Sequence, residues 1–268
     1  MGYADLDFFD VTVEEHVAVV RLNRPEAGNA YTAEAHTQMS LIYGRLADDD
    51  EVHVAVITGT GRVFSIGPDS AFAHELNTNP EVAARGMEEA RRMIVAAYDC
   101  PKLLIAAING RIVGGGLAFT LCNDIVIIDR DVELREIHIP AAVTAGDGGV
   151  LFWPMAMGFL RAKRYVLTGD PLSAEDAERF GLVTEAVAPG TALDRAMVYA
   201  RRFASGPQHA LRTTKRSLNE LLRHSPLGAF DQSVLLEAAS MMRPEAALAM
   251  GDLVAGGPGA MAPDEPRG

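Results

Sequence analysis

The feature of this 268-residue sequence that most constrains its fold is an alternation of short buried strands with helical segments. The β-branched run Val54–Thr58 and the apolar run Leu103–Ile108 have the composition of buried strands. Apolar residues recur at helical spacing in Ala33–Leu46 and Val82–Tyr98, which precede them. Strands that alternate with helices pair in parallel through right-handed crossovers. The sequence therefore predicts an α/β fold, most simply as one large domain.

The regions on either side of this alternation differ from it. Two short strands, Phe8–Val13 and Val17–Leu22, come first and are predicted to form a hairpin. After a strand at Asp124–Ile128, the segment Leu134–Gly149 is rich in Gly, Ala and Pro, and loops of this length tend to be functional. Mostly helices are expected beyond it, at Val150–Met157, Leu160–Thr168, Ala174–Phe180, Leu193–Ala204, Ala210–Leu222 and Leu227–Met242.

Composition excludes several classes of protein. With 36 acidic and 24 basic residues, the formal charge of −12 argues against a nucleic-acid surface, because phosphate binding relies on clustered Lys and Arg. The acidic N-terminus does not have the pattern of a secretory signal, and no apolar run reaches the roughly 18 residues of a membrane span. The two cysteines, Cys100 and Cys122, are too few for a disulfide framework. We therefore expect a cytoplasmic protein that binds neither nucleic acid nor membrane.

Two glycine-bearing loops follow the buried strands, where parallel sheets usually place their sites. Gly59–Asp69 has neither the dinucleotide-binding spacing of glycines nor a Walker-type ending. Asn109–Gly116 ends in three glycines before the helical run Leu117–Leu121. Without Cβ atoms, the backbone N–H groups there are open to a substrate, and a helix N-terminus favours negative charge. The alternative is that these glycines only permit close packing or tight turns.

The loops and their neighbours resemble the signatures of the crotonase superfamily. The matching stretches are Leu22–Ala30, Val56–Asp69 and Ile105–Gly116, and the resemblance extends over about residues 10–240. It implies a crotonase ββα spiral core at residues 1–200 and a C-terminal helical trimerisation region at 201–255. It also implies assembly as a homotrimer or hexamer. Residues 256–268 are rich in Pro and Gly and are predicted to form a disordered tail.

The same resemblance implies an active site for a small-molecule carbonyl substrate. In this superfamily two backbone N–H groups form an oxyanion hole, and by motif position these would belong to Ile66 and Gly115. Enoyl-CoA hydratases also carry two catalytic glutamates, but this sequence has Ala118 and His138 at those positions. Ordinary hydration by a glutamate pair is therefore not expected.

His138 and Asp147 instead resemble the catalytic dyad of 6-oxocamphor hydrolase, which cleaves a cyclic β-diketone by retro-Claisen hydrolysis. The resemblance implies that His138 is the general base for water and that Asp147 orients it. Glu237 matches a glutamate that this hydrolase and many other crotonases carry, which makes it a third candidate for the catalytic site, although a solvated helix-face carboxylate is the simpler interpretation. The leading prediction is therefore a hydrolase of a C–C bond in a β-diketone or a ring-derived acyl-CoA.

Other interpretations remain open at this point. A lone histidine in such a loop is more often structural or exposed, and Asp147 could cap the helix that begins near Gly148. Asp147 could also be a nucleophile, as in 4-chlorobenzoyl-CoA dehalogenases, but those need an aromatic-lined pocket and this chain is 6% aromatic. The alternative functions are an acyl-CoA hydratase, isomerase or dehalogenase that uses His138 and Asp147, or an inactive ligand-binding crotonase.

No bound cofactor or metal is predicted. The remaining histidines do not show the spacing of metal ligands. Coenzyme A could enter as part of a thioester substrate, with Arg24 and Lys215 contacting its phosphates, but the plainer interpretation makes both of them surface charges. Trp153 is expected in the core or in the wall of a pocket.

Overall fold

Two sheets organise the chain, whose computed structural model describes residues 2–223 and 226–254. The larger sheet has the order β1 (Phe9–Glu14), β2 (Val17–Leu22), β3 (Val54–Gly59), β5 (Leu103–Ile108), β7 (Ile125–Asp129) and β10 (Glu185–Val187). Its strands are parallel except for the β1–β2 hairpin. The smaller sheet has the order β4 (Val63–Ser65), β6 (Arg111–Val113), β8 (Glu133–Arg135) and β9 (Leu172–Ser173).

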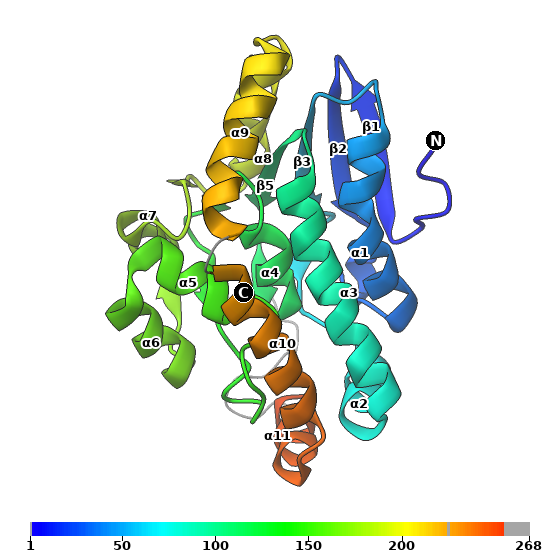
Figure 1. Cartoon of the computed structure of the whole chain (residues 1–268), viewed down its shortest axis with the longest axis vertical. Helices are drawn as coiled ribbons and strands as arrows, with labels where there is room; N and C mark the ends of the chain where they lie inside the picture. The colour runs from blue at the N-terminus through cyan, green and yellow to red at the C-terminus, as the bar shows by residue number, and fades with distance from the viewer. Residues whose placement is uncertain (1, 224–225, 255–268) are drawn as a thin grey trace, which may run out of the picture.

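Helices cover both faces of the larger sheet and gather at the C-terminal end of the chain (Figure 1). The first four are α1 (Ala33–Asp48), α2 (Ser70–Thr78), α3 (Pro80–Asp99) and α4 (Gly115–Leu121). They are followed by α5 (Gly149–Met157), α6 (Phe159–Thr168), α7 (Ala174–Phe180), α8 (Ala192–Ala204), α9 (Gln208–Arg223), α10 (Pro226–Met241) and α11 (Pro244–Val254). α10 packs along α3 and contacts α5, so the C-terminal region returns to the middle of the fold.

The two sheets are joined by tight turns, because each of β3, β5 and β7 continues as a short strand of the smaller sheet. Two of these turns pack against each other. A Cβ atom at Gly59 would lie 2.7 Å from the Val63 carbonyl oxygen, and one at Gly110 would overlap the Arg62 carbonyl oxygen. Glycine is therefore required at both positions, and this repeated strand–turn–strand unit is the ββα spiral.

Alternate residues of the central strands pack on opposite faces of the sheet. Val54 and Val56 of β3 face α8, where the small residues Ala192, Ala196 and Ala200 let the helix approach closely. The other face contributes to the main core together with α1, α3 and α4. Both β3 and β5 are buried at every position, as expected of parallel strands covered on both sides.

The predicted α/β fold is confirmed in its main elements. The hairpin, the buried strands and the helices lie within a few residues of their predicted bounds. The short strands of the smaller sheet, α2 and α11 were not predicted; the strands are too short to show periodicity. The division at residues 200 and 201 stays a prediction, and the predicted tail at 256–268 lies outside the described residues. In the described part of the chain, no helix has the length and apolarity to cross a membrane.

Candidate active site

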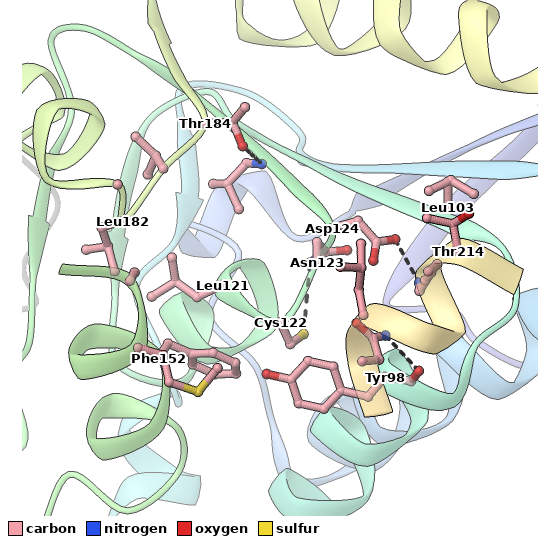
Figure 2. A pocket seen from close by; sticks show the side chains of 18 of the residues that line it. Tyr98, Leu103, Leu121, Cys122, Asn123, Asp124, Phe152, Leu182, Thr184 and Thr214 are labelled. Atoms are coloured by element: carbon pink, nitrogen blue, oxygen red, sulfur yellow. Dashed lines mark hydrogen bonds and ion pairs between the residues drawn. The ribbon is translucent and has the colours of Figure 1, made fainter. Parts of the chain in front are cut away.

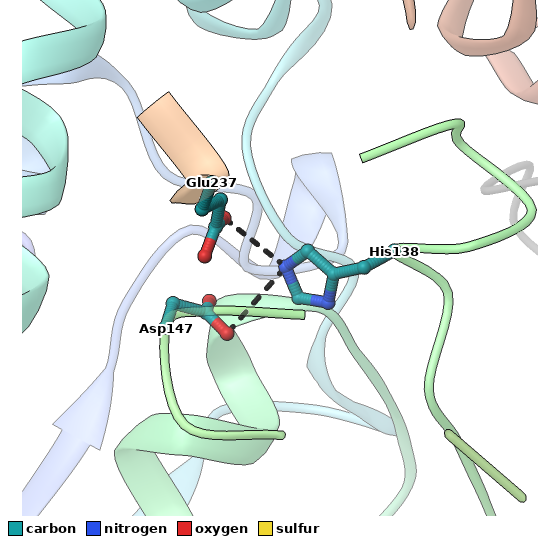
Figure 3. Close-up of side chains that lie close together, drawn as sticks. All are labelled: His138, Asp147 and Glu237. Atoms are coloured by element: carbon teal, nitrogen blue, oxygen red, sulfur yellow. Dashed lines mark ion pairs between the residues drawn. The ribbon is translucent and has the colours of Figure 1, made fainter. Parts of the chain in front are cut away.

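A buried histidine ring surrounded by three carboxylates forms the candidate active site. His138 Nε2 lies 3.4 Å from Asp147 Oδ1 and 3.4 Å from Glu237 Oε1. Figure 3 shows this one ring nitrogen facing both carboxylates, which come from a loop and from α10. The other ring nitrogen, Nδ1, forms a short hydrogen bond with Glu136 Oε1. All four residues are buried, and Glu237 is only 1% exposed.

Different elements position these side chains. Glu136 and His138 follow β8 directly. Only Ile137 separates them in the chain, and their side chains contact each other. The His138 backbone N–H also donates to Glu136 Oε1, at 3.1 Å, which fixes the carboxylate beside the ring. Asp147 lies on the loop that precedes α5, and Glu237 lies on α10. The site therefore depends on α10 packing against that loop.

Glycines on both sides of Asp147 make this packing close. A Cβ atom at Gly146 would lie 2.8 Å from Glu237 Oε2, and one at Gly149 would lie 2.7 Å from Glu136 Oε2. The Ser233 hydroxyl of α10 also donates to the Gly146 carbonyl oxygen at 3.0 Å. The glycine-rich loop thus lets two carboxylates approach the same ring as Asp147.

The two carboxyl groups that face Nε2 have pKa values that are shifted in opposite directions. Burial raises the pKa of Glu237 to about 7, with Asp147 adding to the rise and His138 opposing it. Burial also tends to raise the pKa of Asp147, but the charge of His138 and its hydrogen bond lower it on balance. For His138, burial alone would lower the pKa, but Glu136, Asp147 and Glu237 together raise it well above its usual value. At neutral pH the ring is therefore an imidazolium, Asp147 is ionised, and Glu237 holds its proton for much of the time.

A small, mainly apolar cavity of about 70 Å³ is lined by His138, Asp147 and Glu237. Glu237 Oε2 is buried and has no hydrogen-bond partner among the described residues, so this oxygen is available to a ligand. Tyr31, His36 and Phe72 form another part of the wall, together with Gly115 at the start of α4. The cavity thus offers an ionised base, a protonated acid and an apolar surface for a carbon chain.

Comparisons with known proteins agree with this fold and this type of site. A family model described as enoyl-CoA hydratase/isomerase matches residues 12–239. The chain belongs to this family, the crotonase superfamily. (E)-benzylidenesuccinyl-CoA hydratase of Thauera aromatica is 34% identical over 209 residues, which cover 76% of this chain and 79% of the relative. Crotonyl-CoA hydratase of Syntrophomonas wolfei is 32% identical over 210 residues, which cover 77% of this chain and 79% of the relative.

Solved structures of crotonases support the same assignment. An enoyl-CoA hydratase/isomerase from Mycobacterium paratuberculosis superposes with a TM-score of 0.87 at 31% sequence identity, and the match covers 91% of this chain and 98% of that one. The predicted superfamily is therefore confirmed. The relatives named above are hydratases, and these comparisons give no support to the finer resemblance to 6-oxocamphor hydrolase.

The structure brings together the three side chains proposed to be catalytic, but it changes two interpretations. Glu237 is not a solvated helix-face carboxylate, because it is buried against His138. Asp147 does not cap α5: the cap residue is Gly148, without a side-chain hydrogen bond. The raised pKa of His138 favours a protonated ring, and its role as general base stays a prediction. Trp153 lies in the core, as expected.

The predicted oxyanion hole is not assembled as expected from its two amides. The Ile66 N–H donates to the Gly28 carbonyl oxygen at 3.2 Å, so it is not free, and the prediction for Ile66 is contradicted. Pro68 of the same loop lines the cavity but has no N–H. Gly115 does line the cavity; burial raises the pKa of the neighbouring Tyr31 hydroxyl, and the Gly115 amide opposes that rise. Its part in an oxyanion hole stays a prediction.

The two cations proposed to contact coenzyme A, Arg24 and Lys215, do not line the cavity that contains His138. Arg24 donates to the Ala30 carbonyl oxygen at 2.8 Å and lies 3.7 Å from Asp69, with its side chain 32% exposed. Lys215 is not a surface charge: it is 5% exposed, donates to the Lys102 carbonyl oxygen at 2.8 Å and lies 2.7 Å from a carboxylate oxygen. Both cations are thus occupied by contacts within the chain.

The carboxylate that pairs with Lys215 belongs to Asp124, at the start of β7. Burial raises the pKa of Asp124, and Lys215 opposes that rise. The pair borders a cavity of about 610 Å³, and Figure 2 shows Asp124 on one side of it and Leu182 on the other. Lys215 therefore ties α9 to the sheet.

The site could also be considered for a metal. Ligand-type atoms of His138, Asp147 and Glu237 lie within 4.8 Å of one another. His138 Nε2 lies between the two carboxylates, 3.4 Å from each, so in this structure the ring itself occupies the centre of the group.

Sequence reasoning missed Glu136, Tyr31 and His36. Glu136 could have been found from its spacing, because residues i and i+2 of an extended segment point to the same side. Tyr31 follows directly on the first signature stretch, Leu22–Ala30, in which it was not included. His36 lines the cavity, and its Nδ1 lies 2.8 Å from Glu89 Oε2. Glu89 is 53 positions further along the sequence, so sequence spacing does not reveal this contact.

The role of Lys215 can be tested by substitution. Lys215→Met should lower the free energy of unfolding by about 2 to 4 kcal/mol, because it leaves Asp124 buried without its partner. Chemical denaturation measures this change, and Arg216→Met, an exposed neighbour on α9, should change it by less than about 0.5 kcal/mol. A raised KM for an acyl-CoA with unchanged stability would instead make Lys215 a phosphate ligand.

Proposed function

We propose that this crotonase adds water to, or removes water from, a 2-enoyl thioester, with Asp147 as general base and Glu237 as general acid. One observation carries the proposal. The two carboxyl groups face the same ring nitrogen of His138, yet the pKa of Asp147 is lowered and that of Glu237 is raised to about 7. Paired carboxyl groups with separated pKa values are how enzymes assign an acid and a base.

The reaction follows from these protonation states. Asp147 removes a proton from water while the water oxygen bonds to the β-carbon, and the electron pair of the double bond moves onto the thioester oxygen. Glu237 then gives its proton to the α-carbon, which restores the carbonyl. His138 Nε2 lies 3.4 Å from both carboxylates, so it can give its proton to Glu237 and then take one from Asp147, which resets both groups. Glu136 holds the opposite ring nitrogen throughout.

This pair takes the place of the two hydratase glutamates. Ala118, at one of the two positions, is buried on α4, and its Cβ lies 3.2 Å from where a Cβ atom at Gly148 would be. The Asp147 loop therefore packs against the space that a longer side chain at residue 118 would need. His138, at the other position, becomes the cation between the new carboxyl groups. The acid–base pair thus comes from a loop and a C-terminal helix.

Coenzyme A is the proposed carrier of the acyl group. The named relatives act on CoA thioesters according to their names, and this supports the same class of substrate here. Arg24 is the remaining candidate for contact with a phosphate, because its side chain is partly exposed beside the first signature loop. Lys215 is not proposed for this part.

Hydrolysis of a C–C bond between carbonyls is the second candidate. It is favoured by the absence of carboxylates at residues 118 and 138, where hydratases carry their glutamates. The same groups would serve: Asp147 would activate water toward a ketone carbonyl, and Glu237 would protonate the departing enolate carbon. The two candidates differ in substrate and not in the acid–base pair.

A homotrimer or hexamer is the proposed assembly. Large apolar side chains are exposed on α6 and on the C-terminal helices α9, α10 and α11, which supports burial of these helices between subunits. They are Phe159, Leu160 and Leu167 of α6, Leu218 and Leu221 of α9, Leu235 and Leu236 of α10, and Leu248 of α11.

A substrate panel separates the two functions. The proposal expects loss of the enoyl absorbance when 2-enoyl-CoA thioesters of increasing chain length are mixed with the protein. Cyclic β-diketones in parallel cuvettes should remain unchanged. Turnover of the diketones alone would replace the leading proposal with C–C hydrolysis.

The acid–base assignment predicts both mutant kinetics and a pH profile. Asp147→Asn and Glu237→Gln should each lower kcat by about 100- to 10,000-fold, because each removes one proton-transfer group. Since Glu237 must be protonated, kcat/KM should fall as pH rises through about 7. The lowered pKa of Asp147 keeps the base ionised at lower pH, so no acidic limb is expected near neutrality.

Steady-state kinetics on the best substrate measure these effects. Glu245→Gln, an exposed carboxylate on α11, is the matched control and should leave the profile unchanged. A Glu237→Gln variant that retains wild-type kcat would refute the assigned acid.

A further inference from the structure

The proposed reaction places negative charge on the thioester oxygen, and the cavity needs a hydrogen-bond donor for it. In the superfamily two backbone amides donate hydrogen bonds to this oxygen. Here the Ile66 N–H, one of the two expected donors, is bonded to the Gly28 carbonyl oxygen. Pro68 lines the cavity from the same loop and has no N–H to offer. Neither Ile66 nor Pro68 of the Gly59–Asp69 loop therefore supplies the second donor.

The hydroxyl of Tyr31 lies beside the other amide. A Cβ atom at Gly115 would be 2.5 Å from the Tyr31 hydroxyl oxygen and 3.6 Å from Asp147 Oδ2. The hydroxyl thus stands directly over Gly115, on the side of the cavity that holds the base. A tyrosine hydroxyl has one O–H to donate, so it can donate to an oxygen that binds in the cavity.

The surroundings hold this side chain in place. The Tyr31 N–H donates to the Gly67 carbonyl oxygen at 3.0 Å, and the Tyr31 carbonyl oxygen accepts from Asp69 N–H at 2.9 Å. Its ring packs 5.5 Å from the His36 ring and 6.3 Å from the Phe72 ring, centroid to centroid. Tyr31 is 4% exposed. A donor fixed in this way needs little rearrangement when charge develops.

The hydroxyl also keeps its proton. Burial raises the pKa of Tyr31, and the nearby Asp147 and Glu237 add to the rise against the opposing effect of His138. At neutral pH the group is therefore a neutral donor that can share its proton with an oxyanion without losing it.

We propose that the Tyr31 hydroxyl is a catalytic donor that binds the substrate carbonyl oxygen and stabilises the enolate, in place of an amide of the Gly59–Asp69 loop. The inference rests on the proposed function, because it concerns the oxygen of that reaction's intermediate. The hydrogen bond shortens as charge builds on the oxygen, and no proton is transferred.

Tyr31→Phe tests the proposal, since it removes the hydroxyl and keeps the ring contacts. The expected result is a fall in kcat of about 100- to 1,000-fold, with KM changed by less than about threefold. Tyr98→Phe is the matched control: it removes the hydroxyl of a tyrosine that lines the other cavity, and its kcat should stay within about twofold of the wild type. A Tyr31→Phe kcat within about threefold of the wild type overturns the proposal.

A second measurement needs no turnover. Isotope-edited infrared difference spectra of bound butyryl-CoA, labelled at the thioester carbonyl, report hydrogen bonding to that oxygen. The wild type should lower the carbonyl frequency relative to free butyryl-CoA, and Tyr31→Phe should return it part of the way. An identical shift in both proteins overturns the role of Tyr31 alone. Failure of the wild type to bind butyryl-CoA contradicts the proposed function, and the inference falls with it.

Discussion

The positive charge on the His138 ring is the interaction on which the rest of the site depends. Three buried carboxyl groups converge on this ring, and without its charge they would repel one another in a place with little water. Removing one partner of a buried ion pair typically costs about 3 to 5 kcal/mol. The same charge lowers the pKa of both Asp147 and Glu237, but it outweighs the effect of burial only at Asp147. Asp147 therefore stays ionised, and Glu237 keeps its proton. Stability and acid–base chemistry thus share one cause.

The fold brings the carboxyl groups to the His138 ring because glycines in the Asp147 loop let neighbouring segments pack closely against it. Gly146 lets α10 come near enough to place Glu237 on the ring, and Gly149 leaves room for Glu136. The spiral core fixes the other wall, because the turn after β6 places Gly115 opposite the loop that carries Asp147. The crotonase scaffold is therefore retained, while the proposed acid and base lie at positions other than those of the hydratase glutamates.

The sequence predicted the parts of the molecule that local pattern controls. Val54–Thr58 and Leu103–Ile108 are strands because buried parallel strands require continuous apolar runs. His138 and Asp147 were chosen through a resemblance to the catalytic dyad of 6-oxocamphor hydrolase. The burial of Glu237 and Lys215 was not predictable, because it depends on α10 and α9 packing onto distant parts of the chain. Helical spacing alone cannot tell a buried carboxylate from a solvated one.

The most direct test of the central claim is the protonation state of His138, read from nitrogen-15 chemical shifts of the histidine rings between about pH 5 and pH 9. His138→Gln assigns the signals by their loss. The account predicts that both His138 nitrogens remain protonated through neutral pH, and that Glu136→Gln lowers the pKa of the ring by removing the carboxylate at Nδ1. A neutral His138 ring at pH 7 would contradict it, because the ring could then neither balance the carboxylates nor hold their pKa values apart.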